Sequence, residues 1–460
     1  MAVRTISQEA FDDLVRENLE ELGMDPPEAL QDAIETLTLQ GVDLSGIVTC
    51  VPGQFSANDH PVMRLLDKIK HFESNFNCDA RDLEELAASL HQLSNLCSAD
   101  NSENANIAAK NRGVELVTSV FSKVSPCGNN QVTVSALKAL ASLLYDVQCA
   151  ETFQKSGGPY IIMDVLNGDR QNLEILDGCF SVIGAAATRN EVLKESFMNL
   201  KIEQSIIRIM RRHSAGSIPS LYDAIRILLT SDDNRVVASQ VYGYARKFAE
   251  IGVAEALVDS LSEALSSPSV VSASVALKAV AVNDEICRVV AGKGGIDAIL
   301  RCIDGSGECG NKVVARSCCS LLSKLAGSDV NKSAIVEKGG IGRVIKISKI
   351  FSDDASVLQE VMYLISVLSL RSPDHAARAV EAGAGDLANQ AMQKFPTAQQ
   401  LQRNACLMIR NLAVRNPENR TILLSSGIET AIRKAKEVHG SCKDPATDAL
   451  RDLGLNNYNS

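Results

Sequence analysis

The residues that could do acid–base, metal or redox chemistry are scattered along the chain. The six histidines form no HExxH or similar pair, so a zinc site of that kind is not indicated. The vicinal pair Cys318–Cys319 could bind a metal or change redox state, but it lies in an apolar stretch typical of a buried helix. We therefore expect no enzyme activity, no catalytic residues, no cofactor, no small-molecule substrate and no metal.

A glycine-rich segment, AGKGGI, contains Gly292, Gly294 and Gly295 and superficially resembles part of a phosphate-binding loop. Its spacing is not GxxxxGK[ST], and no strand pattern precedes it. The same glycine pair recurs elsewhere in the chain at a fixed interval. This recurrence favours a structural role.

The thirteen cysteines indicate a reducing compartment. They are scattered, odd in number and without a CxxC motif, and most lie in apolar stretches where cysteine serves as a small core residue. The sequence shows no signal-peptide pattern and no apolar run near 18 residues, which predicts no membrane insertion. We expect reduced thiols and a cytosolic protein, with the nucleus as an alternative.

Charge is distributed unevenly. Residues 1–50 hold eleven acidic residues against Arg4 and Arg16, a net charge of −9, whereas the other 410 residues are nearly balanced at −1. The chain lacks the basic excess that non-specific nucleic-acid binding requires, and we expect no specific nucleic-acid partner. Residues 7–22 place Phe11, Leu14, Val15, Leu19 and Leu22 on one helical face, and Asp25 and Pro26 predict the start of a second helix.

A short motif recurs eight times: a glycine or small residue, an apolar residue, and further apolar residues three and four positions later. Successive copies are 45, 43, 51, 43, 45, 44 and 43 residues apart, and the long step contains the polar segment 211–220. The copies are anchored at positions 113, 158, 201, 252, 295, 340, 384 and 427.

Each repeat is predicted to contain three helices. A short helix such as 331–337 precedes the anchor. A second helix follows it and has apolar residues at helical spacing, for example Ile296, Ile299, Leu300 and Ile303. A longer third helix is apolar around most of its circumference, which indicates burial between neighbours. The third helices include 135–144, 274–282, 317–326 and 405–414.

Residues 61–100 are predicted to form an incomplete first repeat that acts as a cap. Val62, Leu65, Leu66 and Ile69 would face inward from its second helix, and leucines from Leu83 to Leu96 would line its third. The leucine spacing also resembles a nuclear export signal, but a core role is favoured. Residues 51–60 would be a linker, and residues 101–460 would hold eight full repeats.

This arrangement resembles the armadillo-repeat family over about 85% of the chain, most clearly at residues 376–419, which end IRNLAVRNPEN. Residues 6–24 and 41–48 resemble one animal group within the family. The resemblance implies an all-α, right-handed superhelical solenoid of about nine units. It also implies an interaction protein that binds partners in a concave groove lined by third helices.

Armadillo proteins that capture extended peptides carry a ladder of asparagines on the third helices, often with tryptophans. When the third helices are aligned on IRNLA, the ladder position holds asparagine only at Asn95 and Asn411, and the chain has no tryptophan. Lys324 also occupies a ladder position. The resemblance therefore offers little support for a nuclear transport adaptor.

The position one residue before the ladder is basic in five of nine repeats. These five residues, which we call the basic stripe, are Lys138, Arg226, Lys278, Arg410 and Arg451. Long cationic side chains could simply cover apolar neighbours, or they could line the groove for an acidic partner. The candidate partner-binding residues are thus the stripe with Asn95, Lys324 and Asn411.

We expect a protein-binding scaffold or adaptor. A cofactor for an Hsp70-type chaperone is the alternative, because armadillo-like folds also serve there. The acidic N-terminal segment has two alternative roles. It could cap the first repeat with Phe11, Leu14 and Leu19 inward, or it could occupy the basic groove and compete with partners.

Overall fold

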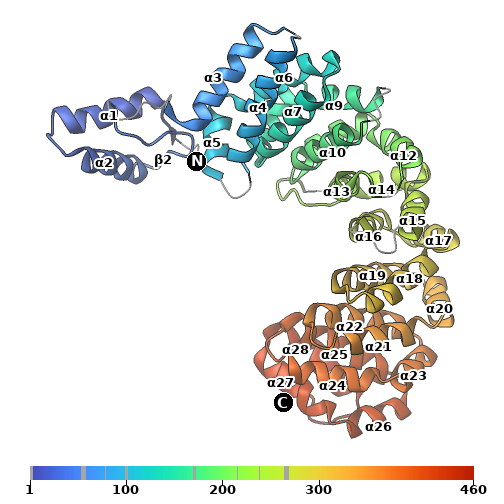
Figure 1. Cartoon of the computed structure of the whole chain (residues 1–460). Helices are drawn as coiled ribbons and strands as arrows, with labels where there is room; N and C mark the ends of the chain where they lie inside the picture. The colour runs from blue at the N-terminus through green and yellow to red at the C-terminus, as the bar shows by residue number, and fades with distance from the viewer. Residues whose placement is uncertain are drawn as a thin grey trace. The chain divides into compact units, whose positions relative to one another are not determined.

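The computed structural model describes residues 4–459 apart from 53–58, 78, 99–101, 169–171, 215, 238 and 264–268. It divides into two compact units, whose helices are labelled in Figure 1. Unit 1 comprises Met1–Ser205 and Thr230–Gln240, and unit 2 comprises Ile206–Leu229 and Val241–Ser460. Most of the linker predicted at 51–60 lies outside the described residues.

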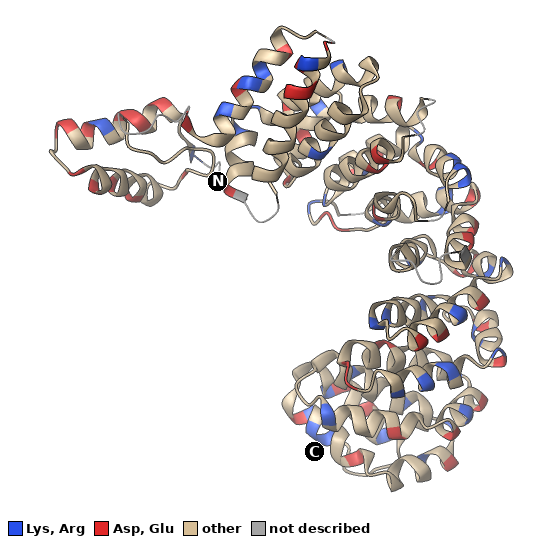
Figure 2. Cartoon of the chain, viewed as in Figure 1, with Lys and Arg blue, Asp and Glu red and all other residues tan. Residues whose placement is uncertain are grey.

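The acidic N-terminal segment folds as a small module with its own core. Helices α1 (Gln8–Glu20) and α2 (Pro26–Leu39) pack on each other, and the two-residue strands β1 (Arg4–Thr5) and β2 (Val42–Asp43) pair in parallel. Acidic residues recur along both helices (Figure 2), and most of them are exposed or half-buried. The core is formed by Phe11, Val15, Ala29, Ala33, Leu37 and Ile47.

Two details of this module differ from the sequence expectations. Leu22 is 62% exposed, because α1 ends at Glu20 and the chain has left the helical face by that residue. Phe11 is fully buried against α2, within the module, whereas the capping role placed it against the first repeat. The module meets the repeats through its C-terminal part, where Lys110 forms an ion pair with Asp43 at 3.6 Å and packs on Gly46.

The repeats of unit 1 begin at Pro61 and follow the predicted helix order. Val62, Leu65, Leu66 and Ile69 are buried, as expected for the second helix of an incomplete repeat. The helices are α3 (Pro61–Ser74), α4 (Ala80–Leu96), α5 (Ser102–Lys110), α6 (Gly113–Val124), α7 (Asn130–Leu143), α8 (Val147–Lys155), α9 (Gly158–Asn167), α10 (Leu173–Ala187) and α11 (Glu191–Asn199).

The boundary between the units falls within α12 (Ile202–Arg212), and unit 2 continues the same pattern. Its helices are α13 (Pro219–Leu228), α14 (Val241–Glu250), α15 (Val253–Glu263), α16 (Ser269–Val280), α17 (Asp284–Gly292), α18 (Gly295–Glu308), α19 (Lys312–Leu325), α20 (Asp329–Glu337), α21 (Gly340–Ile350), α22 (Ala355–Ser369), α23 (Pro373–Glu381), α24 (Ala384–Lys394), α25 (Gln399–Ala413), α26 (Pro417–Ser425), α27 (Ile428–Val438) and α28 (Lys443–Asp452).

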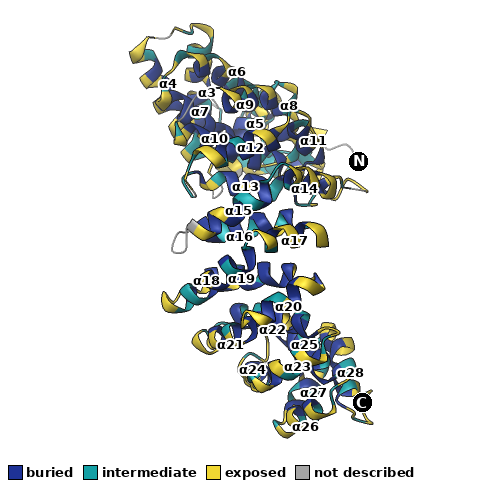
Figure 3. Cartoon of the chain, turned by 90° about the vertical axis from the view of Figure 1, so that its right-hand side faces the viewer, coloured by how far each residue is buried: buried dark blue, intermediate teal, exposed yellow. Residues whose placement is uncertain are grey.

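The third helices form the centre of each unit. In unit 1, α7 packs between α4 and α10, and in unit 2 the series α13, α16, α19, α22, α25 and α28 packs in sequence order. These helices are buried over most of their surface (Figure 3). The all-α repeat fold predicted from the 43–45-residue period is confirmed.

The turn before each second helix depends on two adjacent positions. A residue in the left-handed conformation reverses the chain at all eight anchors, and it is glycine at six of them, as at Gly294 and Gly339. Arg112 and Lys201 take this conformation at the other two. The next residue is often a second glycine packed against the preceding helix. A Cβ on Gly340 would lie 2.7 Å from the backbone oxygen of Ile335, which leaves no room for a side chain.

One cysteine differs from the expected reduced state. Cys127 is disulfide-bonded. The prediction of thirteen reduced thiols is therefore wrong at this position. Eleven other cysteines are free thiols, most of them buried as small core residues.

Replacing Leu325 with alanine tests the buried third-helix core. Leu325 on α19 is 0% exposed, so its truncation should lower the free energy of unfolding by about 2–4 kcal/mol through lost burial and the cavity that remains. Urea denaturation followed by circular dichroism measures this loss. The exposed Val313 on the same helix is the matched control, and its alanine variant should cost under about 0.5 kcal/mol.

Candidate functional site

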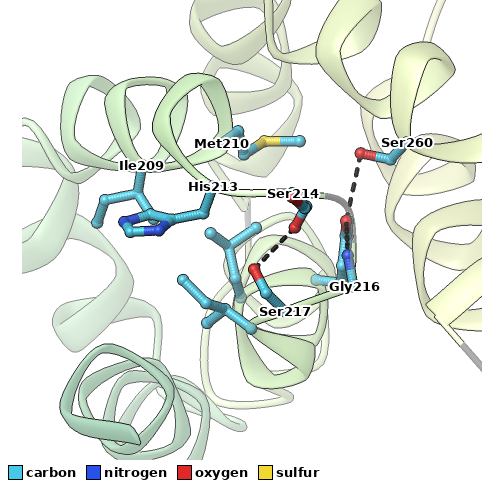
Figure 4. Close-up of a pocket in the computed structure, with 10 residues that line it drawn as sticks. Ile209, Met210, His213, Ser214, Gly216, Ser217 and Ser260 are labelled. Atoms are coloured by element: carbon cyan, nitrogen blue, oxygen red, sulfur yellow. Dashed lines mark hydrogen bonds between the residues drawn. The ribbon is translucent and has the colours of Figure 1, made fainter. Parts of the chain in front are cut away.

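The repeat that carries the ten-residue polar segment contains a small cavity in unit 2 (Figure 4). The amide of Gly216 donates to the Tyr222 hydroxyl at 3.2 Å, and that hydroxyl donates to Ser260 on α15 at 3.2 Å. The cavity of about 20 Å³ holds roughly one water molecule. The two hydrogen bonds fasten the polar segment to α15. The cavity beside them is too small for a substrate.

The buried thiols are poor candidates for chemistry. Cys318 and Cys319 lie on α19 with no exposed surface. Burial raises the pKa of Cys319 to about 12, so its thiol stays protonated at neutral pH and is a weak nucleophile. Within the described residues no three His, Cys, Asp or Glu side chains are grouped to bind a metal. No helix there is long and apolar enough to cross a membrane.

Two of the predicted binding residues lie in unit 1. Lys138 on α7 is exposed. Asn95 on α4 is also exposed, and its side-chain amide is 3.2 Å from Nε2 of His91, one turn earlier. Since α4 and α7 are packed neighbours, both side chains lie on consecutive third helices.

In unit 2 the predicted cations Lys278 and Lys324 lie on two third helices that pack on each other, α16 and α19. Nζ of Lys278 on α16 donates to the Ser320 hydroxyl on α19 at 2.7 Å. Lys324 is exposed one helical turn beyond Ser320. Neither lysine forms an ion pair within the described part of the chain. Arg226 on the neighbouring α13 is 40% exposed, with Asp223 at 3.6 Å.

The other two cations of the stripe are paired with acids. Nε of Arg410 on α25 lies 3.5 Å from Asp448 and 3.6 Å from Asp452, both on α28. Arg451 forms ion pairs with the same two carboxylates at 2.8 and 3.0 Å. This end of the stripe is therefore a charge network in which two arginines face two aspartates.

The one ladder asparagine of unit 2 is engaged within the fold. Asn411 is 9% exposed, and its Nδ2 donates to the carbonyl and to the hydroxyl of Ser366 on α22, each at 2.9 Å. Both bonds fasten α25 to α22. The amide donors that would hold a peptide backbone are thus already used.

A pocket that the sequence did not predict opens beside Arg410 and Asn411. Its volume is about 160 Å³, and it adds Arg371 and Arg415 to the candidate set. Both arginines have positive φ, 58° and 60°, in the turn after a third helix. The sequence signal was present, because Arg followed by Asn or Ser recurs there at Arg189–Asn190, Arg371–Ser372 and Arg415–Asn416. The pocket is lined by Ser369, Leu370, Arg371, Ser372, Pro373, Arg410, Asn411, Val414, Arg415 and Asp452.

The three-helix repeats form an armadillo-type repeat fold. The fold resembles a crystal structure of an engineered protein, with a TM-score of 0.69, 16% identity and coverage of 96% of this chain and 98% of that one. It also resembles a structure from a study of a phosphorylation switch that controls the interaction between cadherin and beta-catenin. That match has a TM-score of 0.59 and 13% identity, and covers 85% of this chain and 69% of the other.

In sequence, the chain is similar to armadillo repeat-containing protein 6. A model of that protein's N-terminal domain matches residues 3–64. The Homo sapiens protein is 26% identical over 395 residues, which cover 82% of this chain and 76% of the relative. The Drosophila melanogaster homolog is 25% identical over 390 residues, with coverage of 83% and 80%. The family resemblance expected from residues 6–24 and 41–48 is confirmed.

Proposed function

We propose that the chain is a protein-interaction scaffold that binds an acidic segment of its partner on the third helices of unit 2. The observation that supports this best is the pair Lys278 and Lys324, two exposed cations without an ion-pair partner in the described residues. Cations held on rigid neighbouring helices attract an acidic partner and orient it.

The surrounding side chains support a polar partner as well. Arg316, Ser320 and Lys324 are four residues apart on α19, so they follow one face of that helix. Arg316 and Lys324 are exposed, and Ser320 already accepts a hydrogen bond from Lys278. The resulting surface offers cations and a hydroxyl, which suit carboxylates better than apolar side chains. As a protein-binding solenoid of this kind, the chain would need no catalytic group, and we place it in the cytosol.

Reversing both lysines tests this function. The double variant Lys278→Glu/Lys324→Glu should weaken binding of a fluorescein-labelled Glu-Ser repeat peptide about tenfold, because each exposed ion pair contributes up to about 1 kcal/mol and reversal adds repulsion. Fluorescence anisotropy measures the affinity, which should also fall as salt is added.

The control reverses a lysine outside the third helices. Lys346 is exposed on α21, so Lys346→Glu should leave the affinity unchanged while altering net charge by the same amount per site. Equal binding by the wild-type and double-variant proteins would contradict the proposed surface.

A further inference from the structure

The pocket at the start of α23 has the chemistry of an oxyanion site. Three arginines, Arg371, Arg410 and Arg415, are among its lining residues, together with one acidic residue, Asp452. Arg410 is paired with Asp452 and Asp448, so Arg371 and Arg415 provide the net charge of +2. At about 160 Å³ it is well below the roughly 300 Å³ of a small-molecule site, so it suits one functional group instead of a whole cofactor.

A buried hydroxyl in this pocket lacks a partner. Ser369 is 2% exposed, and its Oγ makes no hydrogen bond to the described part of the chain. A buried polar atom left unpaired costs about 1–3 kcal/mol, and its presence in the pocket wall indicates a group that is bound in the functional state. The hydroxyl of Ser369 can donate to an oxyanion placed there.

The N-terminus of α23 lies beside the pocket. The helix starts with Ser372 as its N-cap, and that side chain makes no capping hydrogen bond. Pro373, the first helical residue, has no N–H, so the first-turn amides are those of Asp374 and His375, at the helix end where the dipole favours negative charge. The amide of Arg371 also makes no hydrogen bond within the described residues.

Unit 1 contains an equivalent turn in which carboxylates occupy these positions. Arg189 has a φ of 53° and precedes the N-cap of α11, as Arg371 precedes the N-cap of α23. Its amide donates to the carboxylate of Asp232 at 3.1 Å, and the amide of Glu191 donates to Asp233 at 3.1 Å. At this one turn the backbone amides therefore bind carboxylates of the chain itself. No acidic residue of the chain takes that role at Arg371 within the described residues.

We propose that this pocket binds a phosphoryl group carried on a serine or threonine side chain of the partner protein. A phosphoryl group carries about −1.5 to −2 charges near neutral pH, which matches the +2 of the lining, and it offers three acceptor oxygens. Arginine binds such a group through paired N–H donors. A carboxylate carries one charge and two oxygens, so it would leave both charge and donors unmatched.

This inference rests on the proposed function and refines it. The partner's acidic segment would lie along Lys278 and Lys324, and a phosphorylated residue would be held at the pocket between α22 and α25. Because the two sites use different residues of unit 2, each can be tested without the other.

Titration of the full-length protein with N-acetyl-O-phosphoserine amide tests the pocket, with inorganic phosphate and N-acetyl-aspartate amide as parallel probes. Isothermal titration calorimetry should show one saturable site, with phosphoserine binding more tightly than either other probe. Arg371→Gln/Arg415→Gln should weaken phosphoserine binding at least about tenfold, since two charge-assisted hydrogen-bonding groups are lost. Ser369→Ala should weaken it about threefold to tenfold.

Two comparisons make the test specific. Ser369→Ala should not lower the melting temperature of the unliganded protein, because the hydroxyl makes no hydrogen bond to the described residues and its removal relieves an unpaired buried group. Arg301 is exposed on α18, and Arg301→Gln should not change phosphoserine binding.

Several results would overturn the proposal. They are the absence of saturable phosphoserine binding at millimolar concentration, binding that the double variant retains, or equal affinity for the aspartate probe. Tighter binding of inorganic phosphate than of phosphoserine would also overturn it, because the site would then serve the free ion. In each case the unphosphorylated-peptide experiment on Lys278 and Lys324 still decides the proposed function separately.

Discussion

Replacing Lys194 with alanine should lower the free energy of unfolding by about 3–5 kcal/mol, because removing one member of a buried ion pair leaves its partners uncompensated. Lys194 on α11 is 0% exposed. Its Nζ donates to the carbonyl of Thr230 at 2.5 Å, to Glu191 at 3.3 Å and to the carboxylate of Asp232. Chemical denaturation gives the stability change, and amide hydrogen exchange should increase across Thr230–Gln240.

The chain offers a matched control for this substitution. Lys332 on α20 is 5% exposed, and its Nζ donates to the carbonyl of Leu370 at 3.0 Å and to Asp329 at 2.9 Å. The side chain of Asp329 is 87% exposed, so it remains solvated after Lys332→Ala. We expect the Lys332 variant to cost clearly less than the Lys194 variant. Equal costs would show that the buried Glu191 and half-buried Asp232 carboxylates do not dominate the cost of removing Lys194.

Acid should destabilise the segment Thr230–Gln240. Hydrogen bonding by the Arg235 side chain, together with the amide of Glu191, holds the pKa of Asp233 well below its usual value. A carboxylate whose pKa is lowered by folding stabilises the fold above its unfolded pKa, about 3.9, and this contribution is lost as the pH falls below it. Hydrogen exchange of Thr230–Gln240 should therefore rise below about pH 4 in wild type.

The repeat order could be predicted from the sequence because each repeat carries the same local signals. Apolar spacing, polar loops and glycine at the turns recur, so an error in one repeat is corrected by the others. Arg112 and Lys201 were not predicted to take the left-handed conformation, because side-chain sterics disfavour it and only the packing of the flanking helices imposes it. Lys194 likewise has the sequence context of an exposed lysine on a short amphipathic helix, and its burial depends on a segment 36–38 residues later.

The candidate site was predictable only in part, for a related reason. Helix periodicity located Lys278 and Lys324 on the third helices, since that position follows from the repeat alone. Asn411 donates hydrogen bonds to Ser366, and Arg410 forms ion pairs with aspartates of α28. Both interactions join neighbouring repeats, so the spacing of residues within one repeat does not predict them. Arg371 and Arg415 lie in turns, where the conformation of the backbone decides which way a side chain points.

Phe153 and Gly158 provide the clearest test of how each repeat turns between its first and second helices. Phe153 on α8 is 0% exposed, and its ring covers Gly158 so closely that a Cβ on that glycine would lie 2.1–2.4 Å from three ring carbons. Phe153→Ala should cost about 3–5 kcal/mol, as a buried aromatic truncation. Gly158→Ala should cost about 1–3 kcal/mol or more, because the ring or the helix must move.

The double variant separates this contact from other causes. With the ring removed, the closest clash at position 158 is gone, so the Gly158→Ala step should cost at least about 1 kcal/mol less in the Phe153→Ala background than in the wild-type protein. The resulting coupling of about 1 kcal/mol or more is measured by urea denaturation of all four proteins. Gly157 is the control, because its φ of 75° penalises any side chain and nothing lies within 4 Å of its Cβ position. Gly157→Ala should therefore cost the same amount with or without Phe153, and a coupling as large as that of Gly158 would contradict the proposed packing of the turn.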